Sequence, residues 1–178
     1  MDDFDRLFRE FHAPIVRYLT HLLADRDLAE ELAQETFLRA FRHGPVQNER
    51  SWLFAVATNL VRDTARREVR QRRHLELLRT EEQERENERE DEEEGVFARQ
   101  DPAEVSLARE ALNSLAERDR NALLMSEEGL NYHEIASALG LSVQSVGTTL
   151  TRARKRVVQN YEALQKARVG KGGTHVAS

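Results

Sequence analysis

The stretch RTEEQERENEREDEEEGVFARQDP, residues 79–102, restricts the possible folds of this chain more than any other part of its sequence. It has almost no apolar side chains, so it cannot bury enough surface to offset the entropy lost when a chain becomes ordered. We therefore interpret it as a linker, although its glutamates and arginines also favour a single solvated helix. A segment of about 60–75 residues remains on either side, which is enough for one small domain each.

The negative charge of the chain is concentrated in this middle part. The formal net charge is -5, yet residues 75–104 carry 13 acidic and only 4 basic side chains, and both flanking segments are slightly positive. There is no cysteine, which excludes disulfides and thiolate metal sites and fits a reducing cytoplasm. No stretch approaches the roughly 18 apolar residues of a membrane-spanning helix, so we expect no membrane insertion.

The apolar periodicity predicts an all-α protein with two small helical domains joined by the acidic linker. Three prolines, eight glycines and few alternating β-branched stretches leave little room for strands. The expected helices cover residues 2–23, 28–42, 51–70, 104–114 and 117–127, followed by a closely spaced pair. Asp25 or Asp27 should cap the second helix and Ser51 the third. The expected organisation is a domain at 1–74, a linker at 75–104, a domain at 105–165 and a disordered tail at 166–178.

The sequence NYHEIASALGLSVQSVGTTLTRARKR, residues 131–156, has the pattern of a helix-turn-helix. Asn131 and Glu134 have the spacing of a capping box, with Asn in place of the usual Ser or Thr. Gly140 stands where the chain must turn sharply, because glycine tolerates a positive φ. Ser142 can then cap the second helix. Two helices with this spacing are typical of DNA-binding proteins.

The second helix of this pair has one apolar face and one polar and basic face. At about 100° per residue, the residues on the apolar side are Val143, Val146, Leu150, Ala153 and Val157. Such a helix fits the major groove of DNA, with polar residues near base edges and cations at phosphates. The expected DNA contacts are Gln144, Ser145, Thr148, Thr149, Arg152, Arg154, Lys155 and Arg156. The alternative is a helical hairpin whose basic end only complements its helix dipole.

A second basic surface is predicted on the sequence SWLFAVATNLVRDTARREVRQRR, which begins at Ser51. Asn59 and several arginines fall in one narrow stripe of this helix. Arginines beside an aromatic ring and a loop are typical of proteins that bind single-stranded or distorted nucleic acid. The candidate contacts are Trp52, Asn59, Arg62, Arg66, Arg67 and Arg70. The alternatives are a solvated helix face for the stripe and a core position for Trp52.

Three blocks of the sequence, in this order, resemble a known family. They are DLAEELAQETFLRAFR, SWLFAVATNLVRDTARR and ALNSLAERDRNALLMSEEGLNYHEIASALGLSVQSVGTTLTRARKR. The chain resembles the extracytoplasmic-function (ECF, group IV) sigma factors of bacterial RNA polymerase, which belong to the sigma-70 family. The resemblance covers nearly the whole chain outside the linker and tail. It implies that residues 1–74 are sigma region 2 and residues 105–165 are sigma region 4.

The resemblance also implies what the chain does and which partners it has. A sigma factor directs polymerase to specific promoters and assists promoter opening, and it needs no cofactor or metal of its own. Its partners would be promoter DNA, the β′ clamp helices and β flap of core polymerase, and an anti-sigma factor. The helix at 28–42 matches the part that docks on the clamp helices, with Glu31, Gln34, Glu35, Phe37 and Arg39 as expected contacts.

The two nucleic-acid surfaces acquire separate roles from the same resemblance. The loop at 44–50, with Asn59, Arg62 and Arg66 behind it, matches the surface that captures an unstacked base of the −10 element. The second helix of the helix-turn-helix matches the reader of the −35 element. Many members carry a basic residue at position 147 and an arginine at position 149, where this chain has Gly147 and Thr149. The expected base contacts therefore shift to Gln144, Ser145, Thr148 and Arg152.

Three alternatives concern other functions and the linker. An enzyme is disfavoured because there is no phosphate-binding glycine loop, and HEIAS has Ser137 where a zinc protease motif has its second histidine. A stand-alone helix-turn-helix regulator would leave the helix at 28–42 and the arginine stripe without a role. The linker is either a solvated tether, which in the family threads towards the RNA path, or a nucleic-acid mimic that covers the basic faces.

Overall fold

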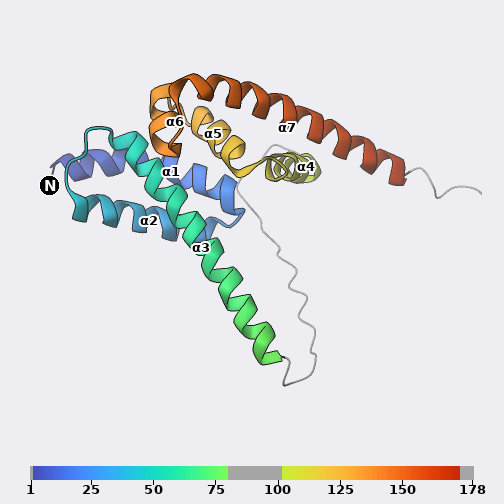
Figure 1. The fold of residues 1–178 in the computed structure, drawn as a ribbon, viewed down its shortest axis with the longest axis horizontal. Helices are drawn as coiled ribbons and strands as arrows, with labels where there is room; N and C mark the ends of the chain where they lie inside the picture. Colours follow the sequence, from blue (N-terminus) through green and yellow to red (C-terminus); the bar gives the residue numbers. More distant parts are fainter. Residues whose placement is uncertain (1, 80–101, 173–178) are drawn as a thin grey trace, which may run out of the picture. The chain divides into compact units, whose positions relative to one another are not determined.

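The computed structural model describes residues 2–79 and 102–172, and in these residues every regular element is an α-helix (Figure 1). The all-α prediction is confirmed. The described residues form two compact units, one from residues 2–46 and 53–79 and the other from residues 47–52 and 102–172. Most of the predicted acidic linker lies outside the described residues, and both of its interpretations remain predictions.

The first unit begins with two antiparallel helices, α1 (Asp2–Leu23) and α2 (Arg26–His43), joined by a very short turn (Figure 1). Asp25 caps α2 as predicted, because its side chain accepts a hydrogen bond from the Leu28 amide at 2.9 Å. The cap satisfies an amide that has no partner inside the helix. Phe11, Ile15 and Leu19 on α1 are buried with apolar residues of α2 to form the core.

The third helix, α3 (Glu49–Arg79), joins this core near its beginning. The rings of Tyr18 and Phe54 are 5.1 Å apart, and the Tyr18 hydroxyl lies 2.7 Å from Oγ1 of Thr58. The prediction that Ser51 caps the helix is wrong: the helix starts two residues earlier and Ser51 is buried within it. A buried serine at this position cannot serve as the non-helical residue that an N-cap requires.

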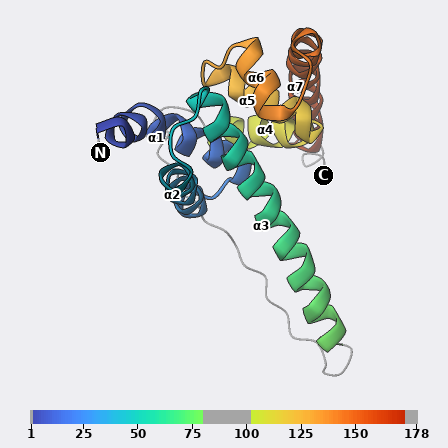
Figure 2. The ribbon, with the colours of Figure 1, turned by 60° about the vertical axis from the view of Figure 1, so that its left-hand side comes forward.

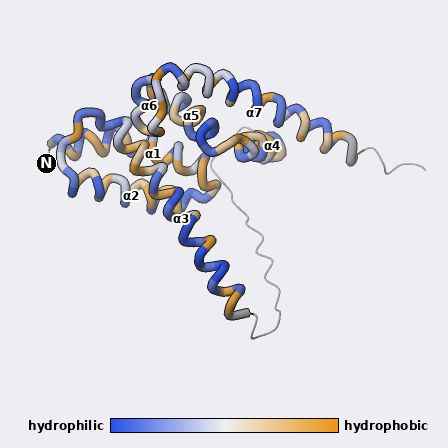
Figure 3. The backbone as a smooth tube through the Cα atoms, in the orientation of Figure 1, coloured by the Kyte–Doolittle hydropathy of each residue, from blue (hydrophilic) through white to orange (hydrophobic). Residues whose placement is uncertain are grey.

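The same helix continues past the predicted end at residue 70 to Arg79. The reason is that no glycine or proline follows to stop it, and its Glu, Arg and Leu residues favour helix. Figures 1 and 2 show that its second half projects away from α1 and α2, and Figure 3 shows that this half is mostly hydrophilic. Residues 65–77 are exposed, so they present their side chains to solvent on all sides.

The second unit contains α4 (Pro102–Asn113), α5 (Glu117–Glu127), α6 (Tyr132–Leu139) and α7 (Val143–Gly172). Its core joins Leu115, Leu123 and Ala153, and the partly buried Leu112 and Val157 pack against them. The prediction of a disordered tail from residue 166 is wrong as far as residue 172, because α7 is helical to that point. Near its end, Arg168 donates a hydrogen bond to the Ala103 carbonyl at 3.2 Å, which ties α7 to the start of α4.

Candidate nucleic-acid interface

The helix-turn-helix predicted from residues 131–156 is formed by α6 and α7. Both halves of the predicted capping box are present: Asn131 accepts from the Glu134 amide at 2.9 Å, and Glu134 accepts from the Asn131 amide at 2.8 Å. Gly140 ends α6 in the left-handed conformation with φ +66°. Ser142 accepts a 3.3 Å hydrogen bond from the Ser145 amide at the start of α7. These local hydrogen bonds fix the angle at which α7 leaves the turn.

The buried face of α7 agrees with the predicted apolar stripe. Val146, Leu150 and Ala153 are fully buried, while Val143 and Val157 are partly buried. The opposite face of α7 points away from the core, and four of its residues follow one another at spacings of four, three and four, which is the spacing of one helix face. These exposed residues are Gln144, Thr148, Thr151 and Lys155. They form one continuous polar stripe, which we name the α7 stripe.

Thr151 was not predicted as a DNA contact, although it lies in the middle of the α7 stripe. Its hydroxyl donates a hydrogen bond to the Gly147 carbonyl at 3.0 Å and can still accept from a ligand. The regular spacing from Gln144 to Lys155 is the sequence signal that would have identified it. Tyr132 lies beside this surface, since a β-carbon added at Gly147 would be 3.4 Å from its ring. Its side chain is about half exposed.

One predicted DNA contact is buried. Thr149 is only 4% exposed, so it cannot reach a base from this conformation. The physical reason is its angular position: it lies at the edge of the buried face, next in sequence to Leu150. A polar residue type was mistaken for an exposed position. Ser145, the other predicted contact near the turn, uses its hydroxyl to bond the Ser142 carbonyl at 2.8 Å.

Arg152, predicted as a base contact, forms an ion pair with Asp119 of α5. Its Nε and Nη2 donate to the two oxygens of Asp119 at 2.8 and 2.5 Å. The carboxylate is 2% exposed, whereas the Arg152 side chain is 36% exposed. Hydrogen bonds from Arg152 hold the pKa of Asp119 below its usual value, and they outweigh burial, which acts in the opposite direction.

The remaining predicted cations of α7 are exposed. Arg156 brings Nη1 to 3.9 Å from the Asp119 carboxylate, and Arg154 donates to the Ser126 hydroxyl at 3.3 Å. Both therefore flank the α7 stripe with part of their surface available to solvent. Together with Lys155 they give this end of the helix-turn-helix a positive charge suited to phosphate groups.

The arginine stripe on α3 is exposed, except at Arg62. Asn59, Arg66, Arg67 and Arg70 are exposed, while Arg62 is half-buried and donates to Oδ1 of Asn59 at 3.3 Å. Arg66 also lies 3.7 Å from Asp63, a contact at i,i+3 spacing that adds little stability. Trp52 is half-buried in the first turns of α3. The stripe thus offers several guanidinium groups along one side of a projecting helix.

The predicted docking residues on α2 separate into two groups. Glu31 and Gln34 are exposed, and Glu35 accepts a 2.8 Å hydrogen bond from Arg39 one turn later, which lowers the pKa of Glu35. Phe37 does not belong with them. It is 2% exposed, and its ring packs 5.0 Å from that of Phe8, so the prediction that it contacts a partner is wrong in this conformation.

Two exposed apolar residues on α2 were missed by the sequence reasoning. Phe41 is 68% exposed and Leu38 is 48% exposed, and the Phe41 ring packs edge-on against Phe4 at 5.3 Å. Large apolar side chains left in water at one end of a helix often belong to a protein-binding surface. Phe37, Leu38 and Phe41 lie within about 100° of one another around the helix, so the apolar pattern alone does not indicate that Leu38 and Phe41 are exposed.

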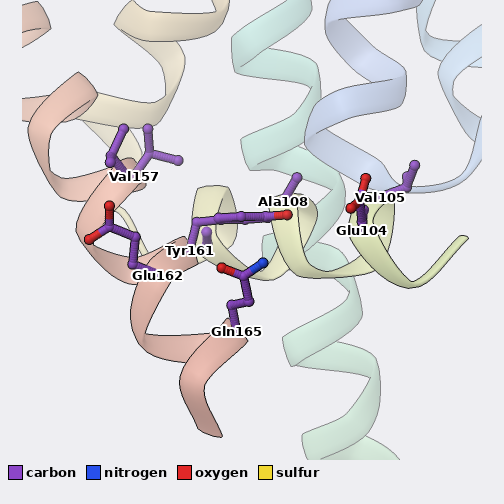
Figure 4. Close-up of a pocket in the computed structure, with 9 residues that line it drawn as sticks. Glu104, Val105, Ala108, Val157, Tyr161, Glu162 and Gln165 are labelled. Carbon is purple, nitrogen blue, oxygen red and sulfur yellow. The ribbon is translucent and has the colours of Figure 1, made fainter. Parts of the chain in front are cut away.

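A groove of about 560 Å³ runs between α4 and α7 in the second unit (Figure 4). Figure 4 shows Tyr161 and Gln165 of α7 beside Ala108 of α4, with Val157 and Glu104 at its two ends. Its lining is mostly apolar, and its charged residues are Glu104 and Glu162. Among residues 2–79 and 102–172, no three His, Asp or Glu side chains come together as metal ligands. In those same ranges no helix has the length and apolar character needed to cross a membrane.

Comparisons with known proteins show the family of this chain. The family described as "Sigma-70 region 2" matches residues 7–71, and "Sigma-70, region 4" matches residues 106–157. The RNA polymerase sigma factor YlaC of Bacillus subtilis is 30% identical over 167 residues, which cover 89% of this chain and 92% of YlaC. This chain belongs to the ECF sigma factors of the sigma-70 family.

Other relatives of this sigma factor support the same assignment. The ferric citrate uptake sigma factor FecI of Escherichia coli is 30% identical, over 84% of this chain and 86% of FecI. The ECF RNA polymerase sigma factor SigE of Mycolicibacterium smegmatis is 32% identical over 88% of this chain, but the match spans only 61% of SigE. Sigma factors as a family are not enzymes themselves.

Two solved structures share the fold of this sigma factor. The sigma factor RpoE of Bartonella quintana, in complex with the anti-sigma factor NepR, has a TM-score of 0.63 at 22% identity and covers 91% of this chain and 98% of RpoE. CnrH, in complex with the cytosolic domain of CnrY, has a TM-score of 0.60 at 20% identity and covers 90% of this chain and 88% of CnrH. The all-α arrangement is therefore that of known sigma factors.

Proposed function

We propose that this chain is the promoter-specificity subunit of a bacterial RNA polymerase, binding core enzyme and starting transcription at a defined set of promoters. The observation that carries the proposal is the α7 stripe, an exposed polar surface with flanking arginines on the second helix of a helix-turn-helix. Membership of the sigma-70 family supplies the polymerase context. The polymerase performs the chemistry, and this chain, acting in the cytoplasm, supplies recognition.

The upstream contact belongs to the α7 stripe. Gln144 and Thr148 lie in the first turns of α7, the part of a recognition helix that approaches base edges in the major groove. A glutamine amide can pair with adenine through one donor and one acceptor, and a threonine can use its hydroxyl or methyl group. Lys155 and Arg154, farther along the helix, are suited to phosphates. This assignment replaces Thr149 with Thr151 among the predicted contacts of the −35 element.

The downstream contact belongs to the arginine stripe of α3. Opening of a promoter exposes unpaired bases and brings two separated phosphate backbones within reach of protein side chains. Asn59 offers an amide that can read the edge of an unstacked base, and Arg66, Arg67 and Arg70 offer charge to the strand that continues from it. The direction of the stripe along one helix suits a strand that follows it.

The polymerase contact belongs to α2 and, in the second unit, to the groove between α4 and α7. On α2 the exposed Glu31 and Gln34 provide polar contacts, and the exposed Leu38 and Phe41 provide apolar area. Full burial of a large apolar side chain contributes about 1.5–3 kcal/mol, so covering the exposed half of Leu38 and two thirds of Phe41 contributes roughly 0.7–2 kcal/mol each. The groove offers a second apolar surface. Besides the clamp helices, the β flap is the other part of core polymerase that the family resemblance implies as a partner.

An anti-sigma factor is a further partner that we propose for this chain. RpoE, which shares its fold, was solved in complex with the anti-sigma factor NepR, and CnrH, which also shares it, was solved in complex with the cytosolic domain of CnrY. The exposed apolar residues of α2 are a surface that such a partner could cover.

Run-off transcription tests the proposed function against the alternative of a stand-alone regulator. Core polymerase is mixed with the chain and with a library of genomic fragments, and the start sites of the transcripts are mapped. We expect a few discrete start sites that require the chain. A matched variant, Gln144→Ala with Thr148→Ala, should lose those starts while still binding core enzyme. A regulator would bind duplex DNA but give no start sites with core enzyme alone.

A further inference from the structure

The ion pair between Asp119 and Arg152 joins two helices with different tasks. Asp119 lies on α5, which contributes to the core of the second unit, and Arg152 lies on α7 one turn after Thr148 of the α7 stripe. The carboxylate is almost completely buried at 2% exposure, whereas Arg152 is 36% exposed. The pair therefore has one member fixed inside the unit and one member at the recognition surface.

The atoms used in this pair decide what Arg152 can still do. Asp119 engages Nε and Nη2, which is one side of the guanidinium. A guanidinium has five N–H groups, so both N–H groups of Nη1 and one of Nη2 remain after two are used. The remaining groups form the end of the side chain, and two of them can still donate in parallel to one acceptor pair such as guanine O6 and N7 or a phosphate.

An arginine without such a partner has many rotamers and loses that freedom when it binds. Asp119 reduces this loss of conformational entropy on binding, because a bidentate pair already fixes both the position and the plane of the guanidinium. The carboxylate also lies 3.9 Å from Nη1 of Arg156, so it offsets part of the positive charge of two arginines one turn apart. Less charge weakens binding to arbitrary DNA, while a fixed fork favours one acceptor arrangement.

We propose that Asp119 is a positioning residue for promoter recognition, holding Arg152 with its outer N–H groups directed to a guanine of the upstream element. This inference rests on the proposed function. It predicts a specific effect: loss of the Asp119 charge lowers the preference for the correct sequence more than it lowers binding to DNA in general. A side chain that only stabilised the fold would weaken both kinds of binding together.

The experiment begins with the holoenzyme, formed from the full chain and core polymerase. A duplex is selected from a random-sequence pool with the wild-type holoenzyme, and a scrambled duplex of the same composition serves as the non-specific probe. The dissociation constant for the scrambled duplex is then divided by that for the selected duplex. This ratio is measured for wild type, for Asp119→Asn and for Glu127→Gln. Glu127→Gln removes one negative charge from the exposed end of the same helix, which makes it the matched control.

We expect Asp119→Asn to lower this ratio about tenfold, the effect of one misplaced base contact, without weakening binding to the scrambled duplex. Glu127→Gln should leave the ratio unchanged. In a background of Arg152→Gln, the Asp119→Asn substitution should have no further effect on the ratio, because the arginine that it positions is absent. Independent, additive effects of the two substitutions would contradict the inference.

Arg152→Lys provides a second variant in case Asp119→Asn does not fold. Lysine keeps the charge but cannot span both oxygens of Asp119 while presenting two parallel donors, so the ratio should again fall by about tenfold. An unchanged ratio in Arg152→Lys, or in folded Asp119→Asn, overturns the inference alone. A wild-type holoenzyme that selects no sequence at all contradicts the proposed function and, with it, this inference.

Discussion

Lys155 offers a direct test of the assignment of the α7 stripe to DNA. It is exposed on α7, 11 residues after Gln144 on the same face, in the part of the stripe that should lie near phosphates. A lysine that neutralises one phosphate releases condensed counterions, which contributes about 0.9 to the slope of log affinity against log salt. This contribution to the affinity vanishes at about 1 M salt and grows to about fivefold at about 0.15 M. Lys155→Gln should therefore bind the selected duplex about fivefold more weakly near that salt concentration.

Lys166→Gln is the matched control for this change. Lys166 is exposed on the same helix, and 11 further residues place it about 16 Å farther along the axis, beyond the width of a major groove. Holoenzyme binding is measured by fluorescence anisotropy at several salt concentrations for wild type and both variants. We expect a smaller slope only for Lys155→Gln. If Lys155→Gln keeps the wild-type slope, or if both variants lose slope equally, the placement of DNA along the α7 stripe is wrong.

The remaining predictions concern the two units that hold these surfaces. Thr58 donates its only hydroxyl proton to the Phe54 carbonyl at 2.7 Å, so Tyr18 must donate to Thr58. Thr58→Val leaves the buried Tyr18 donor unsatisfied and should lower the free energy of unfolding in urea by about 1–3 kcal/mol. Tyr18→Phe should lower it less, by roughly 1 kcal/mol. The reverse order would show that the proton assignment is wrong. Gly140→Ala should lower the melting temperature by an amount equivalent to about 1–2 kcal/mol, because φ is +66° and no atom lies within 4 Å of the added carbon, which leaves backbone strain as the only cost. Because Arg152 lowers the pKa of Asp119 in the folded state, the pair stabilises the unit above the ordinary Asp pKa of about 3.9 and loses this contribution as the pH falls through the lower, folded pKa. Urea unfolding from pH 6 to pH 3 should accordingly show a steeper loss of stability for wild type than for Asp119→Asn, and equal slopes would contradict the linkage.

Features set by neighbouring residues could be predicted from the sequence. The capping box of Asn131 and Glu134, the left-handed Gly140 and the Asp25 cap all depend on residues within a few positions of one another. The buried face of α7 was also predictable, since five apolar residues share one side of a helix. The composition of the acidic stretch indicated two domains, and the family resemblance then supplied the function, which local patterns alone do not specify.

Features that depend on packing between distant residues were missed. Asp119 precedes Arg152 by 33 positions, and no local pattern indicates that their side chains meet. Phe37 was assigned a surface role by resemblance, but contact with Phe8 of another helix buries it. Thr149 was judged by its polarity, although its angle on α7 places it at the edge of the core. The length of α3 was underestimated because the apolar pattern ends before the helix does.

The central claim is that the α7 stripe and the arginine stripe of α3 contact different parts of one promoter. The most direct measurement inserts a photo-crosslinking amino acid at Thr151 or at Asn59 and maps the crosslinked nucleotides in a polymerase–promoter complex. We predict that Thr151 crosslinks to duplex DNA upstream, and that Asn59 crosslinks to the unpaired strand near the start site. Crosslinks from both positions to the same duplex segment, or from neither position to promoter DNA in an active complex, would contradict the account.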